Sequence, residues 1–175
     1  ETMVELKDIK IAAERLKGII TSTPLIHSAH FSEEYRHDVY IKPENLQITG
    51  AFKIRGAYNM IASLDSETKE RGLIASSAGN HAQGVALAAK LLSAKATIVM
   101  PKTTPLIKTE GTRKLGAEVV LAGDIYDEAY AEARRLEKEK GLRFIHPFDD
   151  EAVIAGQGTI ALEILKELPD CQSIL

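Results

Sequence analysis

The sequence has 175 residues, enough for one domain with a substantial core, and its 45% hydrophobic and 27% charged residues are typical of ordinary folded proteins. A formal net charge of -3 and an aromatic content of only 5% disfavour a surface for nucleic acids or anionic membranes. No apolar run approaches the roughly 18 residues of a membrane span, and the single cysteine cannot form an internal disulfide, so we expect a cytoplasmic protein.

The first predicted element is an amphipathic helix over residues 4–19. Its apolar residues, among them Leu6, Ile9 and Leu16, recur at spacings of three and four. The run DVYIKPEN (38–45) then predicts a short strand that leads into a loop.

From residue 72 onward, short apolar runs alternate with helical patterns. The predicted strands are LIASS (73–77), ATIVMP (96–101), AEVVLAG (117–123) and LRFIHP (142–147), and the predicted helices are 79–94, 105–115, 124–140 and 150–168. Such alternation predicts right-handed βαβ units, hence an α/β fold with a parallel sheet that carries helices on both faces. The final SIL (173–175) predicts the start of another strand, which would need a further part of the protein or a second copy as its partner.

The segment SSAGNHAQG (76–84) follows a predicted strand and opens a predicted helix. Its small residues allow a ligand to approach the backbone, and free amides at a helix N-terminus attract an anion such as a carboxylate or a phosphate. Gly79 and Gly84 lack the G-x-G-x-x-G spacing, which argues against a Rossmann-like nucleotide site. A plain strand-to-helix turn around Asn80 explains the loop equally well.

Lys53 lies between two large apolar residues, Phe52 and Ile54. Apolar neighbours disfavour the ammonium form, so the neutral amine becomes available as a nucleophile, as a base or for a Schiff base. In the alternative interpretation, Lys53 begins a helix and extends to water together with Arg55. We expect Arg55 itself to be structural.

Two further patterns give weaker indications. Two glycines flank Gln157 within AVIAGQGTIALEIL (152–165), where we expect close helix packing. The histidines show no pair at the i, i+4 spacing of a helix-borne metal site and the cysteine is isolated, so we expect no structural metal. His81 alone adjoins a candidate site, and we expect a supporting role for it.

The chain resembles the family of threonine dehydratases and serine racemases in four segments, which occur in the family's order and spacing. They are KPENLQITGAFKIRGA (42–57), SSAGNHAQGVALAA (76–89), ATIVMPKTTPLIKTEGTRKLGAEVVLAG (96–123) and HPFDDEAVIAGQGTIALEIL (146–165). The resemblance spans nearly the whole chain from about Ile9. It implies the tryptophan-synthase-β-like fold, pyridoxal 5′-phosphate as cofactor, and conversion of L-threonine to 2-oxobutanoate and ammonia, or of L-serine to pyruvate.

The resemblance also implies roles for individual residues. In the family, the lysine of the FKxRGA segment binds the cofactor aldehyde covalently and acts in catalysis, which implies these roles for Lys53. Phe52 is implied to pack against the cofactor, and Asn80 to hydrogen-bond its 3-oxygen. The residues implied to bind the substrate carboxylate are Ser77, Ala78, Gly79, Asn80 and His81.

Ala78 distinguishes between two activities of this family. The racemases resemble one another in having a serine at this place, which reprotonates the face opposite the lysine. Because alanine has no proton to deliver, the sequence favours dehydration, with serine racemase as the alternative.

The resemblance further implies a division of the chain. Residues 1–50 correspond to the N-terminal part of the larger domain, 51–150 to the smaller α/β subdomain, and 151–175 to the return into the larger domain. The chain would stop before the glycine loop that binds the cofactor phosphate in the family, so we expect it to be inactive alone. A non-catalytic fragment or interaction module is the alternative. We expect an amino-acid substrate, no nucleic-acid or membrane partner, and a homo-oligomer, either a dimer or a tetramer.

Overall fold

The computed structural model describes residues 3–175 of the chain. Residues 1 and 2, which belong to the predicted division 1–50, lie outside the described residues. In chain order, the elements are α1 (Leu6–Leu16), β1 (Ile26–His27), α2 (Ala29–Tyr35), β2 (Tyr40–Ile41), the 3-10 turn η1 (Glu44–Leu46), α3 (Lys53–Ser63), α4 (Ser66–Arg71), β3 (Leu73–Ser76), α5 (Asn80–Leu91), β4 (Ala96–Met100), α6 (Leu106–Lys114), β5 (Glu118–Leu121), α7 (Tyr126–Lys140), β6 (Arg143–Phe144) and α8 (Glu151–Glu167). No described helix has both the length and the apolar character needed to cross a bilayer.

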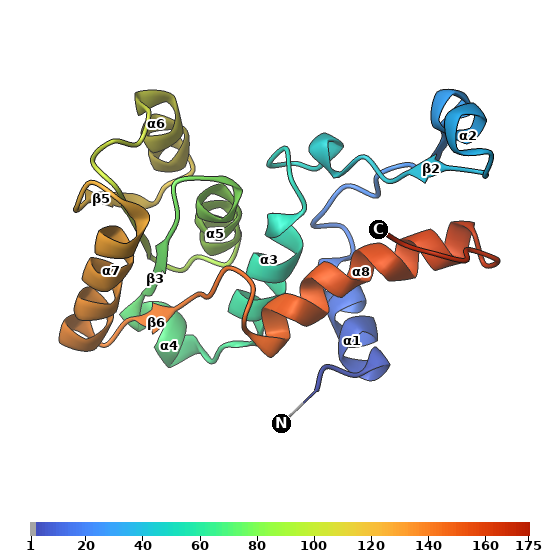
Figure 1. The fold of residues 1–175 in the computed structure, drawn as a ribbon. Coiled ribbons are helices and arrows are strands. Elements are labelled where there is room, and N and C mark those ends of the chain that lie inside the picture. The colour runs from blue at the N-terminus through green and yellow to red at the C-terminus, as the bar shows by residue number, and fades with distance from the viewer. Residues whose placement is uncertain (1–2) are drawn as a thin grey trace.

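The main sheet has four strands in the order β5-β4-β3-β6, and every neighbouring pair is parallel. In its register, Leu73 of β3 lies opposite Ala96 of β4 on one side and Arg143 of β6 on the other. Helices α5, α6 and α7 connect the strands in turn, as Figure 1 shows. The predicted parallel α/β fold is confirmed.

Successive side chains of a strand point to opposite faces of the sheet, and helices cover both faces. Ile74 and Val99 pack against α7 in a cluster that also contains Leu136. Their neighbours Ala75 and Ile98 belong to the larger core on the other face, to which α5 contributes several residues. The sheet therefore lies between α7 and α5 (Figure 1).

Helix α3 forms a further layer, since it packs against α5 on one side and against α8 on the other, with α1 beside them (Figure 1). Two glycines allow α3 and α8 to touch through their backbones. A Cβ placed on Gly156 would lie 2.5 Å from the carbonyl oxygen of Arg55 and 2.6 Å from the Cα of Gly56. The close helix packing predicted around Gln157 is confirmed.

Several boundaries differ from the sequence-based predictions. Helix α1 ends at Leu16 rather than near residue 19, because Gly18 takes a positive φ of 72°. The short helices α2 and α4 were not predicted, although Ser28 and Asp65 cap them with hydrogen bonds to backbone amides. Residues 171–175 form no regular secondary structure and pair with no described segment, so the strand predicted for SIL, which needs a partner from outside these residues, stays a prediction.

Candidate functional site

The sheet order reverses at β3. The chain places β4 and β5 on one side of β3 and then returns through α7 to place β6 on its other side. The carboxyl ends of β3 and β6 are therefore neighbours, at the type of switch point where open α/β sheets bind ligands. The segment SSAGNH follows β3 at this edge, and the residues after β6 meet it from the adjacent strand.

Lys53 is the first residue of α3, and its side chain is half-buried. Its Nζ donates a hydrogen bond of 2.8 Å to the carbonyl oxygen of Pro147, just beyond β6. Burial lowers the pKa of the Lys53 ammonium group below its ordinary value. Lys53 does begin a helix, as the alternative interpretation held, but its amine is bonded inside the protein at the switch point.

The backbone of Lys53 touches α5. A Cβ placed on Gly84 would lie only 3.1 Å from the carbonyl carbon of Lys53 and from the amide nitrogen of Ile54. Gly84 was predicted as part of a ligand loop, whereas in the structure its lack of a side chain allows α5 to approach Lys53. This contact fixes the distance between the lysine and the helix that follows SSAGNH.

Phe52 is the N-cap residue of α3, and 38% of it is exposed. The centroid of its ring lies 5.2 Å from the Nζ of Lys53. An exposed ring beside an amine suits contact with the face of a planar ligand. Its contact with the cofactor stays a prediction.

The loop after β3 is built around a tight turn. The Ser77 Oγ accepts a hydrogen bond of 3.2 Å from the amide of Gly79, which is the N-cap residue of α5. No side chain caps α5, so the amides of its first turn have no side-chain acceptor. Asn80 is exposed, while Ser77, Ala78 and Gly79 are half-buried. The geometry agrees with a turn that binds an anion, and the binding itself stays a prediction.

His81 lies in the first turn of α5 and is 4% exposed. Its Nε2 lies 2.9 Å from the carbonyl oxygen of Ile145, so Nε2 carries the proton and donates it. The Nδ1 atom is buried and has no hydrogen-bond partner among the described residues. Burial is the main cause that lowers the pKa of His81 to about 4. The hydrogen bond to the Ile145 carbonyl opposes it, and the neighbouring Lys53 and His146 lower the pKa by smaller amounts. The imidazole is neutral near pH 7.

Two donors from different helices therefore converge on the residues after β6. His81 binds the carbonyl of Ile145, and Lys53 binds the carbonyl of Pro147. These contacts bring the lysine, its aromatic neighbour and the SSAGNH turn to one edge of the sheet. Sequence reasoning did not identify Ile145 or Pro147, because they act through backbone carbonyls, which every residue carries.

Sequence reasoning also missed the acidic partners of Arg55, whose side chain is completely buried. All five N–H groups of its guanidinium donate hydrogen bonds. Two go to Glu44, two to Glu163 and the fifth to the hydroxyl of Thr159. The expected structural role of Arg55 is confirmed, although it does not extend to water beside Lys53. Its two partners, Glu44 and Glu163, lie outside the FKxRGA stretch and are brought together only by the fold.

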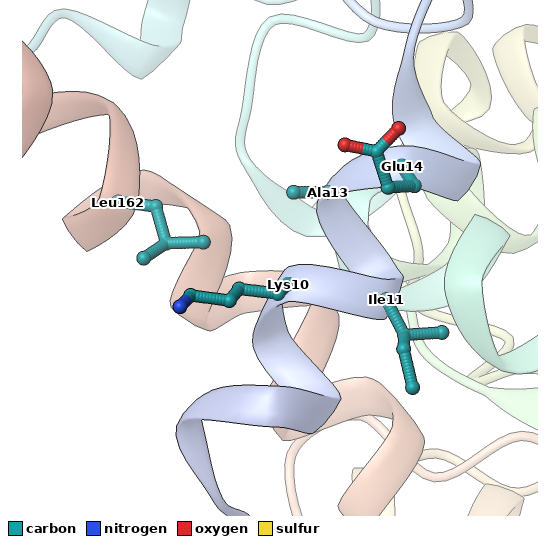
Figure 2. A pocket seen from close by; sticks show the side chains of 5 residues that line it. All are labelled: Lys10, Ile11, Ala13, Glu14 and Leu162. Atoms are coloured by element: carbon teal, nitrogen blue, oxygen red, sulfur yellow. The ribbon is translucent and has the colours of Figure 1, made fainter.

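An open groove elsewhere on the molecule contains none of the predicted site residues. Figure 2 shows this groove between α1 and α8, with the Lys10 side chain extending toward the helix that carries Leu162. Ile11, Ala13 and Glu14 complete its lining. Among the described residues, no cluster of three or more histidine, cysteine, aspartate or glutamate side chains is suited to hold a metal ion.

Comparison with known proteins agrees with this geometry. The family model described as pyridoxal-phosphate dependent enzyme matches residues 16–174. The chain belongs to this family. It is 54% identical over 173 residues to an L-threonine ammonia-lyase of Thermotoga maritima, a match that covers 99% of the chain and 43% of that relative. The chain thus spans less than half the length of that relative.

Solved structures of this family share the fold. The processed form of threonine deaminase isoform 2 from Solanum lycopersicum has a TM-score of 0.90 and 46% identity, over 94% of this chain and 45% of its own. A serine racemase from maize has a TM-score of 0.92 and 34% identity, over 97% of this chain and 51% of its own. The fold type expected from the resemblance is confirmed.

The residues at the switch point fit the cofactor of this family. Lys53 offers an amine with a lowered pKa to an aldehyde, and Phe52 offers a ring face to a planar heterocycle. Nearby, the hydroxyl of Ser76 and the Nδ1 of His81 are buried polar atoms without partners among the described residues. Unsatisfied buried polar atoms are few in native proteins and are typical of places that bind a further group.

Proposed function

We propose that the full-length protein containing this chain is a pyridoxal-phosphate-dependent ammonia-lyase. It would convert L-threonine to 2-oxobutanoate and ammonia, and L-serine to pyruvate and ammonia. The observation that carries the proposal is the half-buried amine of Lys53, bonded to the Pro147 carbonyl at the edge where the SSAGNH turn lies. The similarity to threonine ammonia-lyases supports the choice of substrate.

Lys53, Phe52 and Asn80 are the residues that would hold the cofactor. When bound, pyridoxal phosphate supplies an aldehyde that condenses with amines and a ring that accepts the electrons released at the substrate Cα. Phe52 supplies a face for the ring. Asn80 is exposed at the start of α5, so its side chain would be available to hydrogen-bond the 3-oxygen of the cofactor.

Lys53 would serve as both nucleophile and base. Because burial lowers its pKa, a larger fraction of the amine is neutral near pH 7 than for a lysine in water. With the cofactor bound, the neutral Nζ would be the amine available to its aldehyde, and the same Nζ would be the base that accepts the proton released from the substrate Cα. The Pro147 carbonyl accepts a hydrogen bond from the amine and can hold the ammonium form after proton transfer.

The SSAGNH turn would bind the substrate carboxylate. The first-turn amides of α5 have no side-chain cap, and the positive end of the helix dipole favours a negative charge there. Ser77, Ala78, Gly79, Asn80 and His81 form this turn. His81 contributes a neutral ring, so it supports the turn through the Ile145 carbonyl rather than through an ion pair.

Serine racemisation is the second candidate activity, because the chain is similar to a racemase of maize. Two-sided proton transfer needs an acid on the face opposite Lys53, and Ala78 has none. Exchanging Ala78 for serine would raise racemisation relative to dehydration. Unchanged product ratios would remove this argument for Ala78.

The experiment that tests the function is covalent labelling of the full-length protein. Borohydride reduction in the presence of pyridoxal phosphate should attach the cofactor to Lys53, as read by peptide mass spectrometry. Lys102, which lies beyond β4, is the internal reference lysine in the same digest. Labelling at another lysine, or none, would contradict the catalytic role and favour the non-catalytic interaction module.

We also propose a cytoplasmic location, a homo-oligomeric state and the division of the chain at residues 50/51 and 150/151. The single cysteine, Cys171, is free and supports a reducing compartment. Light scattering of the full-length protein after size exclusion would measure the oligomeric state. A monomer would contradict it.

A further inference from the structure

The loop that carries Lys53 is closed by an ion pair. Glu44 and Arg55 are eleven residues apart, and two parallel hydrogen bonds of 2.8 Å join the carboxylate to the guanidinium. Lys53 and Phe52 lie inside the closed segment. Such bidentate pairs fix orientation as well as distance.

The same guanidinium also fixes this loop to α8. Its other edge donates to the carboxylate of Glu163 at 2.6 and 3.0 Å. The Nζ of Lys42 lies 2.7 Å from Glu163 and is 6% exposed, so the buried group holds two positive and two negative charges. Burial is the largest single effect on both glutamates and raises their pKa. The hydrogen bonds and charge of Arg55, with further contacts from Thr23 and Gln47 to Glu44 and from Lys42 to Glu163, together outweigh burial, so the pKa of both is lowered.

Neighbouring contacts fix the remaining parts of the loop. The side chain of Gln47 bonds the amide and the carbonyl of Thr21, each at 2.8 Å. The side chain of Gln157 accepts a hydrogen bond of 3.0 Å from the amide of Gly56, in the first turn of α3. The loop is thus held at its beginning, at its middle and at the helix that follows it.

A buried ion cluster of this kind is poorly explained by stability alone. Taking charges out of water costs about as much as the pairing returns, and apolar side chains of equal volume often give equal or greater stability. Two bidentate pairs do supply a defined geometry, which apolar contacts specify less sharply. Because Arg55 lies only two residues beyond Lys53, the defined geometry of the cluster bears on the position of Lys53.

We propose that Arg55 is a positioning residue, which acts through the carboxylates of Glu44 and Glu163 to fix the direction of the Lys53 side chain. The inference rests on the proposed function of Lys53. Arg55 does not touch the reacting atoms in this role. It holds the first turn of α3 so that the amine of Lys53 points to the end of β6.

The test compares Arg55→Lys with the wild type in the full-length protein, purified without pyridoxal phosphate. A small amine-reactive reagent applied across a pH series gives the pKa of Lys53 by mass spectrometry. In the variant we expect this pKa to rise toward that of an ordinary lysine, because a lysine cannot make both bidentate pairs and α3 shifts. Labelling of Lys53 by pyridoxal phosphate and borohydride should become about 10- to 100-fold slower, the expected effect of a displacement near 1 Å.

Two controls separate positioning from general stability. Arg135→Lys changes an exposed arginine that also bridges two glutamates, Glu132 and Glu139, and should leave both readouts unchanged. Leu136→Ala removes a buried side chain from the core between the sheet and α7, on the other side of the sheet from α5. It should lower stability as Arg55→Lys does, but leave the position of Lys53 unchanged. Glu163→Gln is a second variant of the cluster, and it should act in the same direction as Arg55→Lys.

The outcomes are distinguishable. If both Arg55→Lys and Glu163→Gln keep the wild-type pKa and labelling rate of Lys53 while remaining folded, or if Leu136→Ala changes them equally, Arg55 is not a positioning residue. If the wild type is labelled by pyridoxal phosphate at a residue other than Lys53, the proposed function is wrong. The pH series in the cofactor-free protein still decides the role of Arg55 in that case.

Discussion

Arg55 and His81 are two buried basic side chains in the first turns of two adjacent helices, and they differ in their hydrogen-bond partners and in their charge. Arg55 is completely buried, and its guanidinium uses all of its N–H groups on two carboxylates and a hydroxyl. His81 is almost as deeply buried, but it has one hydrogen bond, to a backbone carbonyl, and an unpartnered Nδ1. Burial alone disfavours the charged form of both.

The partners decide the outcome. For Arg55, the hydrogen bonds and charges of Glu44 and Glu163 outweigh burial, so its pKa is raised. For His81, no carboxylate compensates for burial, and the pKa is lowered to about 4. The α3 side of the site is therefore organised by ion pairs, while the α5 side is organised by a neutral ring and by small residues.

The largest effect is expected from removing the buried cation. Arg55→Met removes the main partner of the half-buried carboxylates of Glu44 and Glu163, which should lower the free energy of unfolding by an amount toward the lower end of about 3–5 kcal/mol. Chemical denaturation of the full-length protein, followed by circular dichroism, measures the change. The surface counterpart Arg135→Met should change it far less, since exposed ion pairs contribute little. Equal effects at the two positions would remove the contrast between them.

The second effect concerns pH and separates His81 from Arg55. In the folded protein His81 has a pKa of about 4, against 6.5 for an ordinary histidine, so between these values only the unfolded chain binds the proton. Its contribution to stability is present above pH 6.5 and is lost as the pH falls to about 4, by about 3 kcal/mol in total. His81→Gln keeps a donor toward Ile145 but cannot titrate.

Denaturation midpoints at several pH values between 4 and 7 test this expectation. The wild type should lose stability more steeply than His81→Gln as the pH falls, and the difference between the two isolates His81 from the carboxylates that titrate in the same range. Parallel curves for the two proteins would show that His81 takes up its proton over the same pH range in the folded protein as in the unfolded chain. The ring would then need an acidic partner, as Arg55 has.

The sequence predicted the α/β architecture because its strands are short, apolar and separated by regular helical patterns. The runs 73–77, 96–101, 117–123 and 142–147 each contain an observed strand. Buried parallel strands have this continuous apolar character because both of their faces are covered. The helix of Lys53 was less evident, since its polar residues Arg55 and Asn59 point into the protein rather than to water.

The candidate site was predictable only where side chains carry the chemistry. Lys53 and the SSAGNH turn were found from residue type and local order. The carbonyls of Ile145 and Pro147, by contrast, have no signature in the sequence. Glu44 and Glu163 are ordinary glutamates until the fold brings them to one guanidinium from positions more than a hundred residues apart.

A smaller loss of stability is expected at the α3–α8 contact, on which the Arg55 cluster depends. Gly156→Ala would place a Cβ 2.5 Å from the carbonyl oxygen of Arg55, and backbone atoms cannot move aside as a flexible side chain can. The two helices must separate, which should cost about 1–3 kcal/mol and weaken the pairing of Arg55 with Glu163. The measurement is the denaturation midpoint. An unchanged midpoint would mean that α8 can shift along α3 without loss.

The smallest effect on stability is expected on the α5 side. Gly84→Ala would place a Cβ 3.1 Å from the backbone of Lys53, and a shift of a few tenths of an ångström relieves this contact. Alanine favours the interior of a helix over glycine by about 0.5–1 kcal/mol, so the two terms nearly cancel and the stability should change by less than about 1 kcal/mol.

Even so, that shift moves the backbone of the reactive residue relative to the SSAGNH turn, so labelling of Lys53 by pyridoxal phosphate and borohydride should slow several-fold in Gly84→Ala. Gly111→Ala is the matched control, because its Cβ would meet only the side chain of Gln83 at 3.8 Å. That control should gain stability and keep the labelling rate. If Gly84→Ala behaved in the same way, the approach of α5 to Lys53 would contribute nothing to the geometry of the amine, and its position would depend on the Arg55 cluster alone.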